Sequence, residues 1–152
     1  MARVRQASPA WFAELAHYEW AELAVDVMDC PIPAHNPAGD LMHSAIVLNP
    51  ALLMLSYAWP VHRIGPDYRP RWAQATHLLV YRDTDDAVRF VELNPVTSRL
   101  LNLLAASPST GKAACRQIAE ELQHPYPAQL IVFGCALLTD FCAQGIILGS
   151  QR

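Results

Sequence analysis

The stretch THLLVYRDTDDAVRFVELNPVTSRLLNLL, residues 76–104, decides the predicted fold. Residues 77–81 and 87–93 are rich in strand-forming side chains, and the acidic segment RDTDD separates them, which is typical of an antiparallel hairpin. Asn94 and Pro95 follow at once, and this pair is typical of a helix N-terminus. We therefore expect the hairpin to run directly into a helix that continues to about Ala105.

Upstream of the hairpin, the segment LNPALLMLSYAWPVHRI predicts one more strand. This strand should begin near Ala51 and end by Trp59, because Pro60 has no backbone N–H to donate. GPDYRPRW then predicts a loop. Residues 30–40, CPIPAHNPAGD, hold three prolines and a glycine, which predict another loop without regular structure.

A long helix is predicted near the N-terminus, where Ser8 as an N-cap residue precedes Pro9 and no breaker follows for about five turns. Glu19 falls within its apolar stripe, and a carboxylate there needs a partner, so we expect a salt bridge or a cap rather than catalysis. The stripe comprises Phe12, Leu15, Ala16, Leu23 and Val27, widened by Trp11, Trp20 and Ala24.

Downstream, Thr110 predicts the cap of a second helix over GKAACRQIAEEL, and Pro127 opens a third that ends before Gly145. The predicted fold is α+β, with a three-stranded antiparallel sheet followed by three helices, as in a winged helix-turn-helix domain. We expect residues 1–40 to form the long helix and its proline-rich connecting loop, and residues 41–152 to form the winged-helix-like domain.

The composition predicts one generous core in a cytoplasmic protein. The chain has 152 residues, of which 53% are hydrophobic, yet no apolar run reaches the roughly 18 to 20 residues of a membrane span. The start, MARVRQASPAW, lacks the apolar stretch of a signal peptide. The four cysteines show no CxxC or CxxH spacing, so we expect neither a zinc site nor a redox motif.

No motif in the sequence carries catalytic chemistry. A nucleophile with its base, a glycine-rich phosphate loop and a paired-carboxylate signature are all missing, so we expect no catalytic residue, cofactor or metal ion. His62 and His77 are expected to be structural. The carboxylates of DTDD are expected to form a solvated turn rather than a cation site.

Winged helices often bind DNA, so a transcriptional regulator is the alternative function. The net charge of −3 does not favour it, because DNA binders usually carry a basic stripe that displaces counterions from phosphates. Asp83, Asp85 and Asp86 at the hairpin tip would be repelled by DNA, and residues 128–144 of the third helix contain no Lys or Arg. We therefore expect no nucleic-acid partner.

Two resemblances point to peptide modification. The segments ELNPVTSRLLNLLAASPST, IAEEL and FCAQGIIL resemble PqqD-like domains, the peptide recognition elements of ribosomal peptide modification, in which the sheet edge binds. FAELAHYEWAELAVD, LNPALLMLSYAWPVHRI and HLLVYRDTDDAVRFVELNPVTSRLLNLL are similar to the carboxy-terminal half of the HvfC/BufC peptide-modification chaperones, long labelled DNA-binding, and to the MbnC-type partners of methanobactin biosynthesis. This second resemblance covers about residues 10–148.

The resemblance implies a subunit that performs no chemistry itself. In that family the reaction belongs to a multinuclear non-haem iron oxidase of TIM-barrel type, which oxidises cysteines or neighbouring residues of a short precursor peptide. The HvfC-like subunit docks to this oxidase, presents the peptide and holds no metal. HvfC-like proteins usually carry a separate helical domain in front, whereas only a few residues precede the shared helix here, so we carry over no role of that domain.

An extended peptide can add to a sheet edge through backbone hydrogen bonds, so we expect a groove between the last strand and the third helix. A core role is the alternative for Leu130 and Leu137, and the sequence leaves open whether the sheet edge or the third helix binds. Trp11 and Trp20 are expected to dock the partner, because a minimal winged fold cannot cover both. The expected groove residues are Arg89, Val91, Leu93, Leu130, Phe133 and Leu137.

Overall fold

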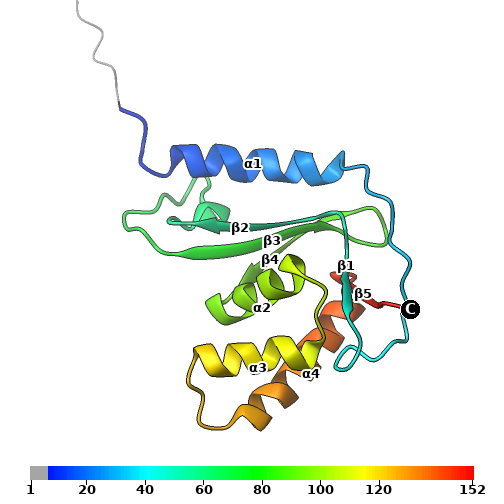
Figure 1. The fold of residues 1–152 in the computed structure, drawn as a ribbon. Coiled ribbons are helices and arrows are strands. Elements are labelled where there is room, and N and C mark those ends of the chain that lie inside the picture. Colours follow the sequence, from blue (N-terminus) through cyan, green and yellow to red (C-terminus); the bar gives the residue numbers. More distant parts are fainter. Residues whose placement is uncertain (1–6) are drawn as a thin grey trace, which may run out of the picture.

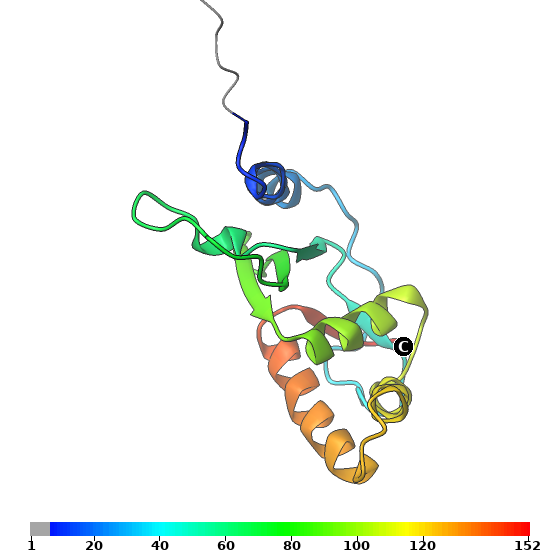
Figure 2. The same cartoon turned by 90° about the vertical axis from the view of Figure 1, so that its left-hand side faces the viewer.

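A computed structural model describes residues 7–152, which form an α+β fold in three layers (Figure 1). Helix α1 covers one face of a central sheet, and helices α2 to α4 lie on the other face (Figures 1 and 2). Of the predicted segment 1–40, residues 1–6 lie outside the described part. The elements are α1 (Phe12–Asp26), β1 (Ile46–Leu48), β2 (Leu52–Tyr57), the 3-10 helix η1 (Val61–Arg63), β3 (Thr76–Arg82), β4 (Val88–Leu93), α2 (Pro95–Ala106), α3 (Gly111–Glu121), α4 (Pro127–Ala143) and β5 (Ile147–Ser150).

The predicted three-stranded antiparallel sheet is confirmed, with β3 between β2 and β4. The acidic turn between β3 and β4 is held by Asp83, whose carboxylate accepts hydrogen bonds from the backbone N–H groups of Asp85 (2.9 Å) and Ala87 (3.0 Å). Asp86 takes the left-handed conformation at φ 58°, which aspartate tolerates better than most residues. The hairpin therefore closes through the side chain of its own first acidic residue.

The sheet separates two apolar cores, because successive side chains of a strand point to opposite faces. Leu79 and Tyr81 of β3 pack toward α2, α3 and α4, whereas Leu78 and Val80 pack toward α1. All four are buried. A strand that is covered on both faces reads as a continuous apolar run, which explains the sequence LLVY of β3.

The helix starts follow the predicted caps. Asn94 Oδ1 accepts a hydrogen bond from Thr97 N (2.8 Å) at the start of α2, and Thr110 Oγ1 accepts one from Ala113 N (3.1 Å) at the start of α3. Asparagine and threonine at these positions satisfy backbone donors that the first helical turn leaves free.

The prediction for α1 is wrong in its start and in its buried face. The helix begins at Phe12, so Ser8 and Pro9 precede it without capping it. Within the described chain, the face against the sheet carries Leu15, Tyr18, Ala21 and Val25, with Met28 just after the helix, whereas most of the predicted stripe is exposed. Alanines and other apolar residues occur nearly all round this helix, so the apolar spacing alone could not select the buried face.

Glu14, rather than Glu19, is the carboxylate that fastens α1 to the sheet. Its Oε1 and Oε2 accept hydrogen bonds from the backbone N–H groups of Ala58 and Trp59, both at 3.0 Å, just beyond the end of β2. Glu19 is exposed. The expected cap within the fold therefore exists, but it belongs to the carboxylate one and a half turns earlier in the helix.

Strands β1 and β5 were not predicted. They pair with each other antiparallel, and Asn36 of the proline-rich loop joins them through mutual backbone hydrogen bonds with Ser150 (2.7 and 3.1 Å). The end of the chain thus fastens the loop that follows α1 (Figure 1). Within the described residues, no helix combines the length and apolar character that a membrane crossing requires.

Candidate binding surfaces

An apolar groove lies between helices α2, α3 and α4. Its walls include Val96 and Leu100 of α2 and Ile118 of α3, and its volume is about 110 Å³. Three of the predicted peptide-binding residues, Leu130, Phe133 and Leu137 of α4, line it together. Leu130 and Leu137 are half-buried, whereas the Phe133 side chain is 73% exposed. The groove is therefore open to solvent at a large aromatic side chain.

The other three predicted residues lie on β4 and do not line this groove. Leu93 is buried and Val91 half-buried, and both pack into the core between the sheet and helices α2 to α4. Arg89 is exposed, and its Nε donates a hydrogen bond to Asp83 Oδ2 at 2.7 Å. This hydrogen bond is the main cause that lowers the pKa of Asp83, and it also raises the pKa of Arg89. Arg89 thus belongs to the hairpin turn.

Strand β4 is an edge of the central sheet. Arg82 N donates to Ala51 O (3.0 Å), so Arg82 turns its backbone groups toward β2. Backbone N–H and C=O groups alternate in direction from one residue of a strand to the next. The N–H and C=O groups of Tyr81, Leu79 and His77 therefore point toward β4. Their partners in β4 are Arg89, Val91 and Leu93. The intervening residues Val88, Phe90 and Glu92 therefore direct their N–H and C=O groups to the edge.

The outer surface of α1 carries large apolar side chains. We call Phe12, Trp20, Leu23 and Val27 the outer α1 face; their exposed fractions are 53%, 55%, 59% and 69%. Trp11, the other predicted docking residue, is half-buried at the N-cap of the helix. Acidic side chains border this face, since Glu19, Glu22, Asp26 and Asp86 line a hollow between α1 and the β3–β4 turn. The face is therefore apolar with an acidic margin.

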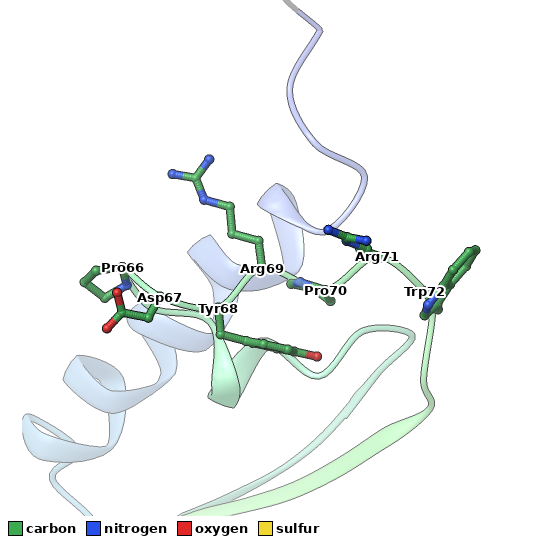
Figure 3. Close-up of a pocket in the computed structure, with 7 residues that line it drawn as sticks. All are labelled: Pro66, Asp67, Tyr68, Arg69, Pro70, Arg71 and Trp72. Atoms are coloured by element: carbon green, nitrogen blue, oxygen red, sulfur yellow. The ribbon is translucent and has the colours of Figure 1, made fainter.

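The loop between η1 and β3 forms another exposed surface, for which the sequence predicts only a loop. It projects from the side of the sheet (Figure 2), and Figure 3 shows the side chains of residues 66–72. Trp72 is 80% exposed and Tyr68 44%. Two arginines with a tyrosine and a tryptophan inside five residues are the signal that could have revealed it, because these residue types are enriched at interaction hot spots.

The histidines make local hydrogen bonds. His62 Nε2 lies 3.0 Å from Glu92 Oε2, and His77 Nδ1 lies 2.9 Å from Ser56 Oγ. Nδ1 of His62 is buried and has no hydrogen-bond partner among the described residues. Across residues 7–152, no three His, Cys, Asp or Glu side chains gather in a way that could hold a metal ion.

Residues 49–142 match the model of a protein family described as the HvfC C-terminal domain. The matched segment contains the β4 edge and the apolar groove, whereas α1 lies before it. No curated protein matches the chain.

Proposed function

Because the chain belongs to the family of HvfC C-terminal domains, which points to accessory subunits in peptide modification, we propose that it binds a precursor peptide and docks to a multinuclear non-haem iron oxidase. In this proposal the chain is not an enzyme. The oxidase performs the reaction, and this subunit contributes binding surfaces.

The open β4 edge beside an apolar groove is the observation that carries the proposal. A peptide strand placed along β4 can bond to the outward backbone groups of Val88, Phe90 and Glu92, as in other complexes that form by strand addition. Val96, three residues beyond the end of β4, lines the groove with Phe133 and Leu137. Apolar side chains of the peptide could therefore enter the groove while its backbone extends the sheet.

The arrangement of the elements supports the same role. The order of strands β2 to β4 followed by helices α2 to α4 supports our proposal that the domain is winged-helix-like and works as a PqqD-like recognition element. The groove would supply specificity, because backbone pairing at an edge accepts many sequences. Arg89, Val91 and Leu93 would then act mainly by shaping the edge strand, since their backbone groups face β3.

The oxidase would dock on the outer α1 face. This face lies on the other side of the sheet from the groove, so both partners can bind at once (Figures 1 and 2). Trp20 is a suitable anchor because it is large, apolar and 55% exposed, and contiguous apolar surface on a small domain usually marks an interaction site.

The charges of the described surface give less support to DNA binding. The hairpin tip presents Asp85 and Asp86, which phosphates would repel, and α4 contains no Lys or Arg. Helix α3 contributes two cations, Lys112 and Arg116, that could approach a phosphate backbone. A regulator that reads the major groove through α4 would have few means of holding the duplex.

The neighbouring genes give a first test of the proposal. A gene for an iron-dependent TIM-barrel oxidase and a gene for a short cysteine-bearing precursor should lie beside the gene for this chain.

Reconstitution gives the direct test. The peptide should be modified when oxidase and chain are both present, and much more slowly when the chain is left out. The purified chain alone should show no turnover and metal well below one equivalent. Stoichiometric iron or zinc in the purified chain, or full oxidase activity without it, would contradict the proposal.

A further inference from the structure

The loop of residues 66–72 presents two positive charges and two aromatic rings to solvent. Arg69 and Arg71 are exposed, and neither forms an ion pair within residues 7–152. The arginines of η1, the sheet and α2 differ, since Arg63, Arg82, Arg89 and Arg99 each pair with a carboxylate. The two loop arginines are therefore available to pair with carboxylates of another molecule.

Backbone hydrogen bonds order the start of this loop and fasten its base. Gly65 and Tyr68 exchange backbone hydrogen bonds of 3.0 and 3.3 Å, and Gln74 N donates to Ala58 O at 2.8 Å. Pro70 is buried and lies between the two exposed arginines. An anchored loop loses little conformational freedom when a partner binds, so its side chains can contribute more of their contact energy to affinity.

The hollow in this loop is an unsuitable site for a small molecule. It measures about 630 Å³, but its walls come from seven consecutive residues of one segment, with none from the body of the fold. Small-molecule sites are usually concave, mostly apolar and largely enclosed. Figure 3 shows instead that Arg69, Arg71 and Trp72 extend away from the loop backbone, which is the arrangement of a surface that a larger partner covers.

We propose that loop 66–72 is a docking element for an acidic polypeptide surface. Trp72 would enter an apolar recess of the partner, and Arg69 and Arg71 would pair with carboxylates around that recess. Arginine suits this role because its planar guanidinium can bond both oxygens of a carboxylate. For the identity of the partner this inference rests on the proposed function, which makes the oxidase subunit the occupant.

Charge complementarity favours a polypeptide with carboxylates over a nucleic acid. The loop holds only two cations and also carries Asp67, and the whole chain has a net charge of −3. A phosphate backbone extends beyond the loop and would meet this net negative charge, whereas a small acidic patch would meet the loop alone, where Arg69 and Arg71 outnumber Asp67. The outer α1 face has an acidic margin, so it would favour a basic surface elsewhere on the same partner.

A peptide titration tests the inference without any assumption about the oxidase. A short peptide of alternating glutamate and leucine is added to the labelled chain, and amide chemical shifts are followed by NMR. Shifts should concentrate in residues 66–74 and weaken with added salt, and the matching lysine–leucine peptide should leave the loop unchanged. An absence of shifts in the loop, or equal shifts with the lysine peptide, overturns the inference.

The variants for this titration are R69E combined with R71E, and W72A. Both should remain folded, because all three side chains are exposed, and both should weaken peptide binding roughly tenfold or more, as expected of hot-spot residues. R116E is the matched control, since Arg116 on α3 is also exposed and unpaired within the described chain. Equal loss in R116E would show a general charge effect and overturn the inference.

The same variants are then measured with the oxidase, with duplex DNA and with anionic lipid vesicles. Loss of oxidase binding in the loop variants, with wild-type binding in R116E, supports the assignment of the occupant. Binding of DNA or vesicles that depends on Arg69 and Arg71 and exceeds peptide binding overturns it. If the wild-type chain does not bind the oxidase, the proposed function fails, while the peptide titration still decides the chemistry of the loop.

Discussion

At the scale of single residues, Gly134 sets how closely α3 and α4 approach. A Cβ atom at this position would collide with Sγ of Cys115, which is buried. Gly134 also forms part of the groove wall, so the missing side chain helps to keep the groove open. A small residue in the middle of an apolar helix is thus explained by packing against the neighbouring helix.

The variant G134A should therefore be less stable than the wild type. Overpacking typically costs about 1–3 kcal/mol, and the higher helix propensity of alanine returns about 1 kcal/mol, so we expect a net loss of roughly 1 kcal/mol in the free energy of unfolding. Urea unfolding measures it. G65A is the matched control, because nothing lies within 4 Å of a Cβ added there. Equal stability of the two variants would contradict this account.

Asp83 links the acidic turn to the pH dependence of stability. Its pKa in the folded chain is lowered, chiefly by the hydrogen bond from Arg89 and then by those of the turn backbone. A carboxylate with a lowered folded pKa contributes stability above its unfolded pKa, and this contribution disappears as the pH falls through the folded pKa. D83N should therefore lose stability at neutral pH and show a shallower decline in acid.

Unfolding measured at several pH values from neutral to strongly acidic tests this expectation. D67N, in the exposed loop, is the control for loss of a carboxylate, since Asp67 takes no part in the hairpin turn. An acid dependence of D83N as steep as that of the wild type would show that the turn does not depend on this charge.

The sequence allowed prediction of residues whose role is local, and it failed where the partner is distant. Asn94 and Thr110 cap the helices that follow them directly, so spacing was sufficient. Glu14 bonds to Ala58 and Trp59, more than forty residues away. No local pattern distinguishes Glu14 from Glu19 on the same helix, so the partnered carboxylate could not be chosen.

At the scale of elements, α1 exposes the side chains that docking would use. W20E should abolish co-purification with the oxidase and leave the fold intact, because Trp20 is 55% exposed and its ring lies beside that of His17, with centroids 5.3 Å apart. Co-purification and circular dichroism together test this. L122E, at an equally exposed site beyond α3, is the control. Unfolding of W20E, or unchanged binding, would contradict the docking role.

The element order also shows where prediction from sequence succeeds. The β3–β4 hairpin and α2 are continuous in sequence, so alternation, turn residues and a cap predicted them together. Strands β1 and β5 are short and pair across about a hundred residues, and such pairing leaves no local trace. For the groove, α4 contributed the three expected residues, but the contacts with Val96 and Ile118 depend on how the helices pack.

At the scale of the whole molecule, the sheet separates the two surfaces that we propose for binding, and they differ in character. The groove and the β4 edge lie toward α2 to α4, and the outer α1 face lies on the opposite side (Figure 1). In the described chain the two apolar cores include β3 side chains from opposite faces of the sheet, so a peptide that extends the sheet would touch the layer on which α1 packs. The direct connection from the β3–β4 hairpin to α2 places Val96 of the groove wall three residues after the end of β4.

The most direct test of the central claim is a peptide titration against edge-strand variants. E92P removes an outward N–H of β4, and a proline there also obstructs an added strand. Glu92 pairs with His62 and Arg63, so E92A is the control that loses the side chain and keeps the N–H. S56P makes the equivalent change on β2, the other edge of the sheet.

Fluorescence anisotropy of a labelled precursor peptide should show binding to E92P weakened about tenfold or more, which corresponds to about 1.4 kcal/mol. E92A and S56P should bind nearly as the wild type does. If E92P stays folded and binds the peptide like the wild type, or if S56P weakens binding equally, the peptide does not add to β4 and the central claim is wrong.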